Sequence, residues 1–164
     1  AGAVDVADVH PKKLDRLTRE LERIQQRPRR AFAVDWSRGA GDAKEGSYDR
    51  VLVDAPCSGT GTIRRRPELG LRRSGEDVRE LARLQSAILA RAATLVRPGG
   101  RVVYAVCSIL REEAEEVLAM TPSLNPAPFD SDVAIAIAGE SPTFRLLPHE
   151  HGTDGYFVAS LVRS

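Results

Sequence analysis

The sequence predicts an open, mostly parallel α/β sheet with helices on both faces, formed by a single domain over residues 1–164. Two observations predict this fold class. Short, nearly continuous apolar runs, which suit buried parallel strands, alternate with longer segments whose apolar residues recur at helical spacing. The composition, 42% hydrophobic and 29% charged without a repetitive tract, is typical of one globular domain with a core of its own.

The first third of the chain predicts one β-α unit followed by two strands. Residues 3–8 (AVDVAD) form the first apolar run. Residues 11–27 predict a helix, because proline occupies the first turn and leucine or isoleucine recurs on one face. A second strand is expected at residues 31–35 (AFAVD). The third follows a glycine-rich loop, at residues 48–54 (YDRVLVD).

The middle of the chain predicts a long helix and a buried strand. Apolar residues recur at helical spacing from residue 74 to residue 96, where a Pro-Gly-Gly sequence ends the helix. The next strand is expected at residues 101–106 (RVVYAV). Residues 109–120 then predict a second helix, with Glu112 and Glu113 in its first turn, where carboxylates favour the helix dipole.

The last part of the chain predicts less regular structure. Several prolines and acidic residues at 121–142 indicate a long loop, within which residues 133–138 (VAIAIA) favour a short strand. Two strands, at residues 144–148 and 155–162, close the chain on either side of a polar turn. We expect them to form an antiparallel pair.

Composition argues against membrane and metal functions. The longest apolar run is too short to cross a membrane, and the N-terminus lacks the pattern of a signal peptide, so we expect a cytoplasmic protein with no membrane partner. The two cysteines lie fifty residues apart, without a CxxC or Cys/His cluster. This spacing predicts neither a disulfide framework nor a zinc site.

Basic residues are unevenly placed, although the net charge is only +1. All 24 are arginine except Lys12, Lys13 and Lys44, and arginine is suited to bidentate phosphate contacts. Five arginines lie close together after the third strand, at positions 64–66 and 72–73. Such a run is either a solvated loop or a surface for a polyanion, and both interpretations stay open at this point.

Chemically useful residues follow four predicted strands. Asp8, Asp35 and Asp54 end the first three, and Cys107 follows the fourth. One such aspartate is often only a turn former or helix cap. Repetition on several strands is more informative, because open α/β sheets bind ligands in the crevice outside the carboxyl ends of their strands.

The two cysteines occur in similar settings, APCSG around Cys57 and AVCSI around Cys107. Each follows a strand predicted to reach the same crevice. A redox pair, simple burial as small apolar side chains, and nucleophilic catalysis are the three uses to weigh. In the third, a thiolate adds to an electrophilic carbon and is later expelled.

Several motifs together resemble a known family. DAPCSGTGTIRRRPEL, LQSAIL, LVRPGGRVVYAVCSI and TDGYFVASLV occur in the order seen in the bacterial Sun/Fmu-type RNA (cytosine-C5) methyltransferases of the NOL1/NOP2/Sun family. The resemblance covers essentially the whole chain. It implies the C-terminal part of a Rossmann-like catalytic domain that uses S-adenosyl-L-methionine and acts on RNA, in bacteria most often ribosomal RNA.

The resemblance also implies roles for the crevice residues. Cys107 would be the nucleophile that attacks C6 of the target cytosine, and Cys57 would assist product release. Asp54 would hydrogen-bond the base edge near N3, and the backbone of Pro56 would help hold the base. Val106 departs from the family pattern, which has threonine before the second cysteine.

The remaining implied contacts are with the cofactor and the RNA backbone. Asp8 and Asp35 would bind the ribose hydroxyls and the adenine amino group of the cofactor, with Asp54 beside them. The arginines after Gly61, Arg64 and Arg65 first, would face the RNA.

The family's first strand and its glycine-rich loop have no counterpart in the sequence. We therefore expect a truncated domain that is inactive alone, binds the cofactor weakly, and either repacks residues 1–47 or self-associates through unpaired strand edges. A noncatalytic RNA-binding remnant is the main alternative. A DNA cytosine-C5 methyltransferase, with Cys57 as nucleophile, is a further alternative.

Overall fold

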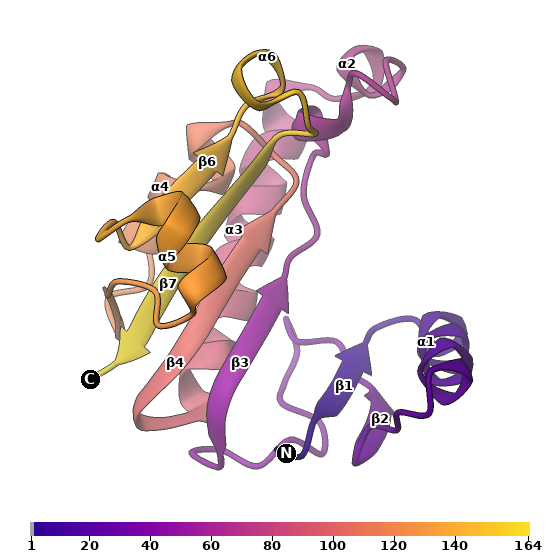
Figure 1. The fold of residues 1–164 in the computed structure, drawn as a ribbon. Helices are drawn as coiled ribbons and strands as arrows, with labels where there is room; N and C mark the ends of the chain where they lie inside the picture. Colours follow the sequence, from indigo (N-terminus) through magenta and orange to yellow (C-terminus); the bar gives the residue numbers. More distant parts are fainter. Residues whose placement is uncertain (1) are drawn as a thin grey trace. The chain divides into compact units, whose positions relative to one another are not determined.

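The computed structural model describes residues 2–164 and divides into two compact units, residues up to 44 and residues 45–164. The prediction of a single domain is not tested by this division and stays a prediction. Figure 1 shows the elements of both units along the chain.

The first unit is a β-α-β unit. Strands β1 (Asp5–Asp8) and β2 (Arg30–Ala33) pair in parallel, with helix α1 (Pro11–Arg23) between them in sequence. The predicted helix to residue 27 is therefore too long. The chain leaves the helix at Ile24, and Gln25 has a positive φ of 58°, which ends helical geometry.

The second unit contains a five-stranded sheet in the order β3-β4-β7-β5, with β6 paired to β7. Strands β3 and β4 are parallel, whereas β7 runs antiparallel to its three partners. The predicted C-terminal antiparallel pair is confirmed as β6 and β7. The strands are β3 (Tyr48–Asp54), β4 (Val96–Val106), β5 (Leu124–Pro126), β6 (Thr143–Leu146) and β7 (Tyr156–Arg163).

Helix α3 (Gly75–Leu95) is the long helix of this unit. Ser74 caps it: the Ser74 hydroxyl accepts the Asp77 amide N–H, and the Asp77 carboxylate accepts the Ser74 amide N–H. Figure 1 shows α3 behind the sheet and α5 in front of it. The shorter helical segments are η1 (Thr60–Thr62), α2 (Leu69–Arg72), η2 (Arg111–Glu113), α4 (Glu115–Ala119), α5 (Asp132–Ala138) and α6 (Pro148–His151).

Two sequence expectations for this unit are wrong. The segment 133–138 is helical, in α5, not a strand. Strand β7 pairs with β4 along one edge and with β5 and β6 along the other, so neither edge of β7 is left for such a strand. The predicted helix at 109–120 is interrupted, because Ala114 leaves helical geometry between η2 and α4.

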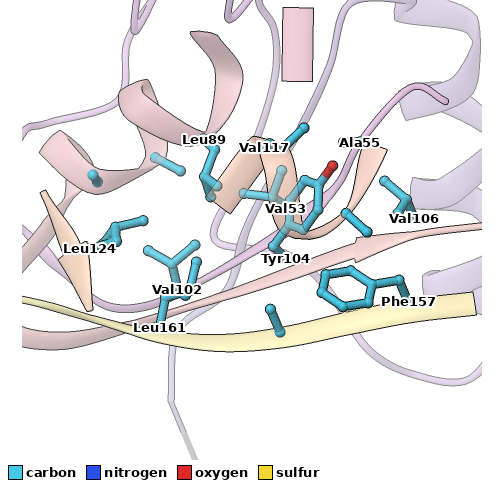
Figure 2. Close-up of a cluster of buried hydrophobic side chains, with 14 of the residues drawn as sticks. Val53, Ala55, Leu89, Val102, Tyr104, Val106, Val117, Leu124, Phe157 and Leu161 are labelled. Carbon is cyan, nitrogen blue, oxygen red and sulfur yellow. The ribbon is translucent and has the colours of Figure 1, made fainter. Parts of the chain in front are cut away.

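The core of the second unit lies between α3 and the sheet. Figure 2 shows Tyr104 of β4 and Phe157 of β7 side by side, and their rings make an edge contact with centroids 6.5 Å apart. Leu89 of α3 and Leu161 of β7 are also almost completely buried. Burial of this apolar cluster fixes β3, β4 and β7 as one rigid platform.

Candidate active site

Two thiols meet at the carboxyl ends of β3 and β4. Asp54 is opposite Ala105 in the parallel register, and the Ala55 amide donates to the Ala105 carbonyl, so the chain leaves both strands at the same level. Cys57 and Cys107 follow, and their Sγ atoms lie 3.2 Å apart as free thiols joined by a hydrogen bond. The expectation that the two cysteines come together where their strands end is confirmed.

The hydrogen bond between the two sulfur atoms shifts the pKa values of the two thiols in opposite directions. It is the largest effect on Cys107 and lowers the pKa of that thiol to about 7 from its ordinary value of 9.0, against burial and the negative charges of Asp54 and Glu113. The same contact, followed by burial, raises the pKa of Cys57 well above the usual range. Cys107 is therefore the thiol that ionises more readily, and once it is ionised only Cys57 can donate the hydrogen bond between them.

Asp54 and Tyr156 border the thiol pair. The Asp54 side chain, at the end of β3, is exposed, and its negative charge opposes ionisation of Cys107. Burial, then the charges of Cys107 and Asp54, raises the pKa of the Tyr156 phenol. Asp54 and Tyr156 therefore lie within electrostatic range of the Cys107 thiol.

A buried polar network holds the backbone around Cys57 in place. Glu113 accepts hydrogen bonds from the Ser58 amide at 2.7 Å, the Ser58 hydroxyl at 2.5 Å and the Gln85 amide group at 3.0 Å. Gln85 also donates to the Pro56 carbonyl at 2.8 Å. The Tyr104 hydroxyl lies 2.8 Å from the Glu113 carbonyl and 3.1 Å from the Gln85 amide oxygen.

The loop after Cys57 is fixed from the side as well. The Gly61 amide donates to the Cys107 carbonyl at 3.1 Å, and the Gly155 amide donates to the Gly61 carbonyl at 2.7 Å. A Cβ at Gly61 would lie 2.0 Å from the Gly155 carbonyl oxygen, so only glycine permits this approach. The hydroxyls of Thr60 and Ser108, 3.0 Å apart, join the two cysteine loops.

The structure places the predicted RNA-facing arginines in the loop that follows. Arg64 and Arg65 are both exposed. Arg65 pairs with Asp154 through both carboxylate oxygens, whereas the Arg64 side chain makes no ion pair with any residue between 2 and 164. The Pro56 side chain is exposed beside the thiols, but its carbonyl is already used by Gln85.

The two predicted cofactor carboxylates lie in the first unit. Asp8 ends β1, accepts the His10 amide at 2.8 Å and pairs with Lys13. Asp35 lies two residues beyond β2 and accepts both the amide and the hydroxyl of Ser37. Because β1 and β2 are parallel neighbours, the two carboxylates lie at the same end of their sheet, and both remain partly exposed.

Sequence reasoning missed Gln85 and Glu113. Glu113 is expected only as a carboxylate in a first helical turn, yet its side chain is fully buried. Gln85 interrupts the apolar face of α3 and is also fully buried. A polar residue at a core position of a helix was the one available signal for this network.

In the described part of the chain, no group of three metal-ligating side chains converges, and no helix is long and apolar enough to span a membrane.

Comparison with known proteins points to one family. The family model described as 16S rRNA methyltransferase RsmB/F matches residues 1–162. Ribosomal RNA small subunit methyltransferase B of Shewanella oneidensis is 33% identical over 163 residues, which cover 96% of this chain and 36% of that protein. Protein Rv1407 of Mycobacterium tuberculosis is 47% identical over 123 residues, which cover 71% of this chain and 26% of that protein.

The fold has a counterpart among solved structures. The crystal structure of PH0851 superimposes with a TM-score of 0.85 at 33% identity, over 99% of this chain and 37% of that one. In sequence and in structure alike, the chain spans less than two fifths of these relatives.

Proposed function

Because this chain belongs to the RsmB/F family of 16S rRNA methyltransferases, we propose that it contributes the cysteine-bearing part of a site that methylates C5 of a cytosine in ribosomal RNA. The observation that carries the proposal is the thiol pair, in which Cys107 is poised as a thiolate at neutral pH beside a thiol donor. Carbon 5 of cytosine is not nucleophilic enough to accept a methyl group unaided, and addition of a thiolate at C6 makes it so.

Cys107 performs the addition. Its sulfur forms a bond to C6, and the electron pair of the C5–C6 double bond becomes available at C5. S-adenosyl-L-methionine, when bound, supplies the methyl group from its sulfonium. A water molecule then takes the C5 proton, and the electron pair of the C5–H bond restores the C5–C6 double bond. The sulfur–C6 bond breaks at the same time, and its electron pair returns to Cys107.

Asp54 and Cys57 support the two halves of this reaction. Asp54, exposed at the end of β3, hydrogen-bonds the edge of the cytosine near N3 and so favours electron flow into the ring. Cys57, whose pKa is raised by its contact with Cys107, assists release of the product from that sulfur. Base entry requires a flipped cytosine, and Pro56 lies exposed beside the thiols, where the base must arrive.

The arginine loop serves the RNA backbone in this proposal. Arg64 is exposed and without an ion pair among the described residues, which suits a phosphate contact. Arg65 is held by Asp154, which orients its guanidinium at the mouth of the site.

Asp8 and Asp35 fit the cofactor's nucleoside part. Carboxylates at the ends of adjacent parallel strands are acceptors for ribose hydroxyls and for an amino group, and both side chains keep exposed surface for this use. Asp8 has His10 and Lys13 as partners, and Asp35 has Ser37 and Arg38. A carboxylate has about four acceptor positions, so each can still accept a hydrogen bond from the cofactor.

Trapping of the covalent adduct tests the proposal. The longest natural product of the gene that contains this sequence is incubated with S-adenosyl-L-methionine and ribosomal RNA carrying 5-fluorocytosine, whose fluorine cannot leave C5 as a proton does. A protein–RNA adduct is expected on denaturing gels. Cys107→Ala abolishes it, whereas Cys57→Ala, the matched removal of the neighbouring thiol, retains it.

Other outcomes would assign other functions. An adduct lost in Cys57→Ala and retained in Cys107→Ala would indicate the chemistry of DNA cytosine methyltransferases. RNA binding without an adduct would indicate a noncatalytic RNA-binding protein.

A further inference from the structure

Glu113 is a buried carboxylate with an unusual set of partners. Its side chain is 0% exposed, and its carboxylate accepts three hydrogen bonds, two from Ser58 and one from Gln85. No ion pair joins it to any residue from 2 to 164. A carboxylate that accepts three hydrogen bonds without a cation is costly to bury, so its position calls for a reason beyond packing.

The donors of Glu113 belong to the segment that carries Cys57. Ser58 directly follows Cys57, and Pro56 directly precedes it. Gln85 bridges Glu113 to the carbonyl of Pro56. The carboxylate therefore holds the backbone on both sides of the thiol. Tyr104 anchors the other end of the network through the Glu113 carbonyl.

We propose that Glu113 is a positioning residue that fixes the Pro56–Ser58 segment and so keeps the Cys57 thiol in hydrogen-bonding contact with Cys107. The nucleophilic state of Cys107 then depends on a carboxylate that touches neither sulfur. This inference rests on the proposed function, because it concerns the same two thiols.

Glu113 affects the pKa of Cys107 in two opposite ways, and the larger of the two effects decides the expected result. Its negative charge raises the pKa of Cys107 slightly, as the least of the effects on that thiol. The hydrogen bond from Cys57, which depends on the loop, is the largest effect and lowers it. Loss of Glu113 therefore raises the pKa of Cys107, because the loss of the contact outweighs the loss of the charge.

Charged and titratable groups face Cys107 from each neighbouring element. They are Cys57 beyond β3, Asp54 at the end of β3, Glu113 in η2 and Tyr156 at the start of β7. Glu113→Gln leaves the other three in place, so a change in the titration of Cys107 reports on the contact between the thiols.

Alkylation of each cysteine with iodoacetamide, followed by mass spectrometry across a pH series, measures this titration. In the unaltered protein we expect the midpoint for Cys107 near 7. In Glu113→Gln it rises toward 9, and at pH 7 the thiolate fraction falls by roughly five- to fiftyfold. Ser58→Ala, which removes one donor and little volume, shifts the midpoint in the same direction by less. Glu112→Gln, a change at the exposed neighbour, leaves it unchanged.

The outcomes separate this inference from the proposed function. A Cys107 midpoint near 7 in folded Glu113→Gln or folded Ser58→Ala would overturn the positioning role. If Glu113→Gln does not fold, as judged by circular dichroism, Ser58→Ala carries the test. Because alkylation needs neither RNA nor cofactor, a shifted midpoint supports the inference even if no RNA adduct forms.

Discussion

Cys57 and Cys107, from loops fifty residues apart, place their sulfur atoms 3.2 Å from each other at the ends of two adjacent parallel strands. The contact gives two chemically equal side chains different properties. The pKa of Cys107 is lowered to about 7, whereas the pKa of Cys57 is raised, so Cys57 keeps its proton when Cys107 has lost its own.

Cys57→Ala removes the donor that lowers the pKa of Cys107. The midpoint of Cys107 alkylation should rise from about 7 toward the ordinary 9.0. Cys57→Ser, which keeps a hydroxyl donor, should give a smaller rise. A Cys107 that titrates near 7 in Cys57→Ala would mean that some other group lowers its pKa.

Stability should depend on pH through the same pair. In the folded state the first proton leaves near pH 7, from Cys107, whereas in the unfolded chain thiols titrate near 9. Between these values the unfolded state binds more protons, so the free energy of unfolding rises with pH, by about 1 kcal/mol once solvent screening at half-buried Cys107 is allowed for. Above 9 the raised pKa of Cys57 reverses the slope.

Urea denaturation under reducing conditions measures this dependence. Cys107→Ala serves as the control, since it removes the group with the lowered pKa. The rise between neutral and mildly alkaline pH should be absent in that variant, and an identical rise in both proteins would assign the effect to other residues.

Gly61→Ala should unfold the loop contact between β3 and β7. The added Cβ would lie 2.0 Å from the Gly155 carbonyl oxygen, and backbone cannot yield as a flexible side chain does. We expect a loss of about 3 kcal/mol in the free energy of unfolding. Gly70→Ala is the matched control, because its Cβ would meet only Ile63 at an ordinary 3.9 Å. Equal stability of the two variants would contradict the close approach.

Tyr104→Phe removes one buried hydroxyl and nothing else. The Glu113 carbonyl and the Gln85 amide oxygen would lose the one hydroxyl hydrogen that they share, at a cost of about 1–3 kcal/mol in thermal or urea unfolding. Tyr156→Phe, at an exposed phenol, should change stability by less than about 0.5 kcal/mol. A neutral Tyr104→Phe would show that the network stabilises little.

The sequence predicted the parts of the site that follow from strand ends. The bounds of β3 match the apolar run at residues 48–54, and adjacent parallel strands must end at one edge, which brought Cys57 and Cys107 together. Local patterns failed where partners are distant. Glu113 follows the rule for a first helical turn, but its burial depends on Ser58 and Gln85, 55 and 28 residues away in the chain.

Segment 133–138 failed for a related reason. Its alternation of alanine with valine and isoleucine suits a strand as well as a helix, and local propensity cannot decide between them. The assembled sheet decides between them, because β5 and β6 already pair with the second edge of β7. A competition among three segments for one edge is visible only once the sheet is assembled.

Strand β7 is the last element of the chain, yet it pairs with β4, β5 and β6. Gly155, directly before it, also supplies the hydrogen bond that clamps the loop after Cys57. Removing β7 would leave both thiols on their loops but would separate three strands that have no other common partner, and it would release the loop after Cys57. The two cysteines therefore depend for their placement on a strand that contributes neither of them.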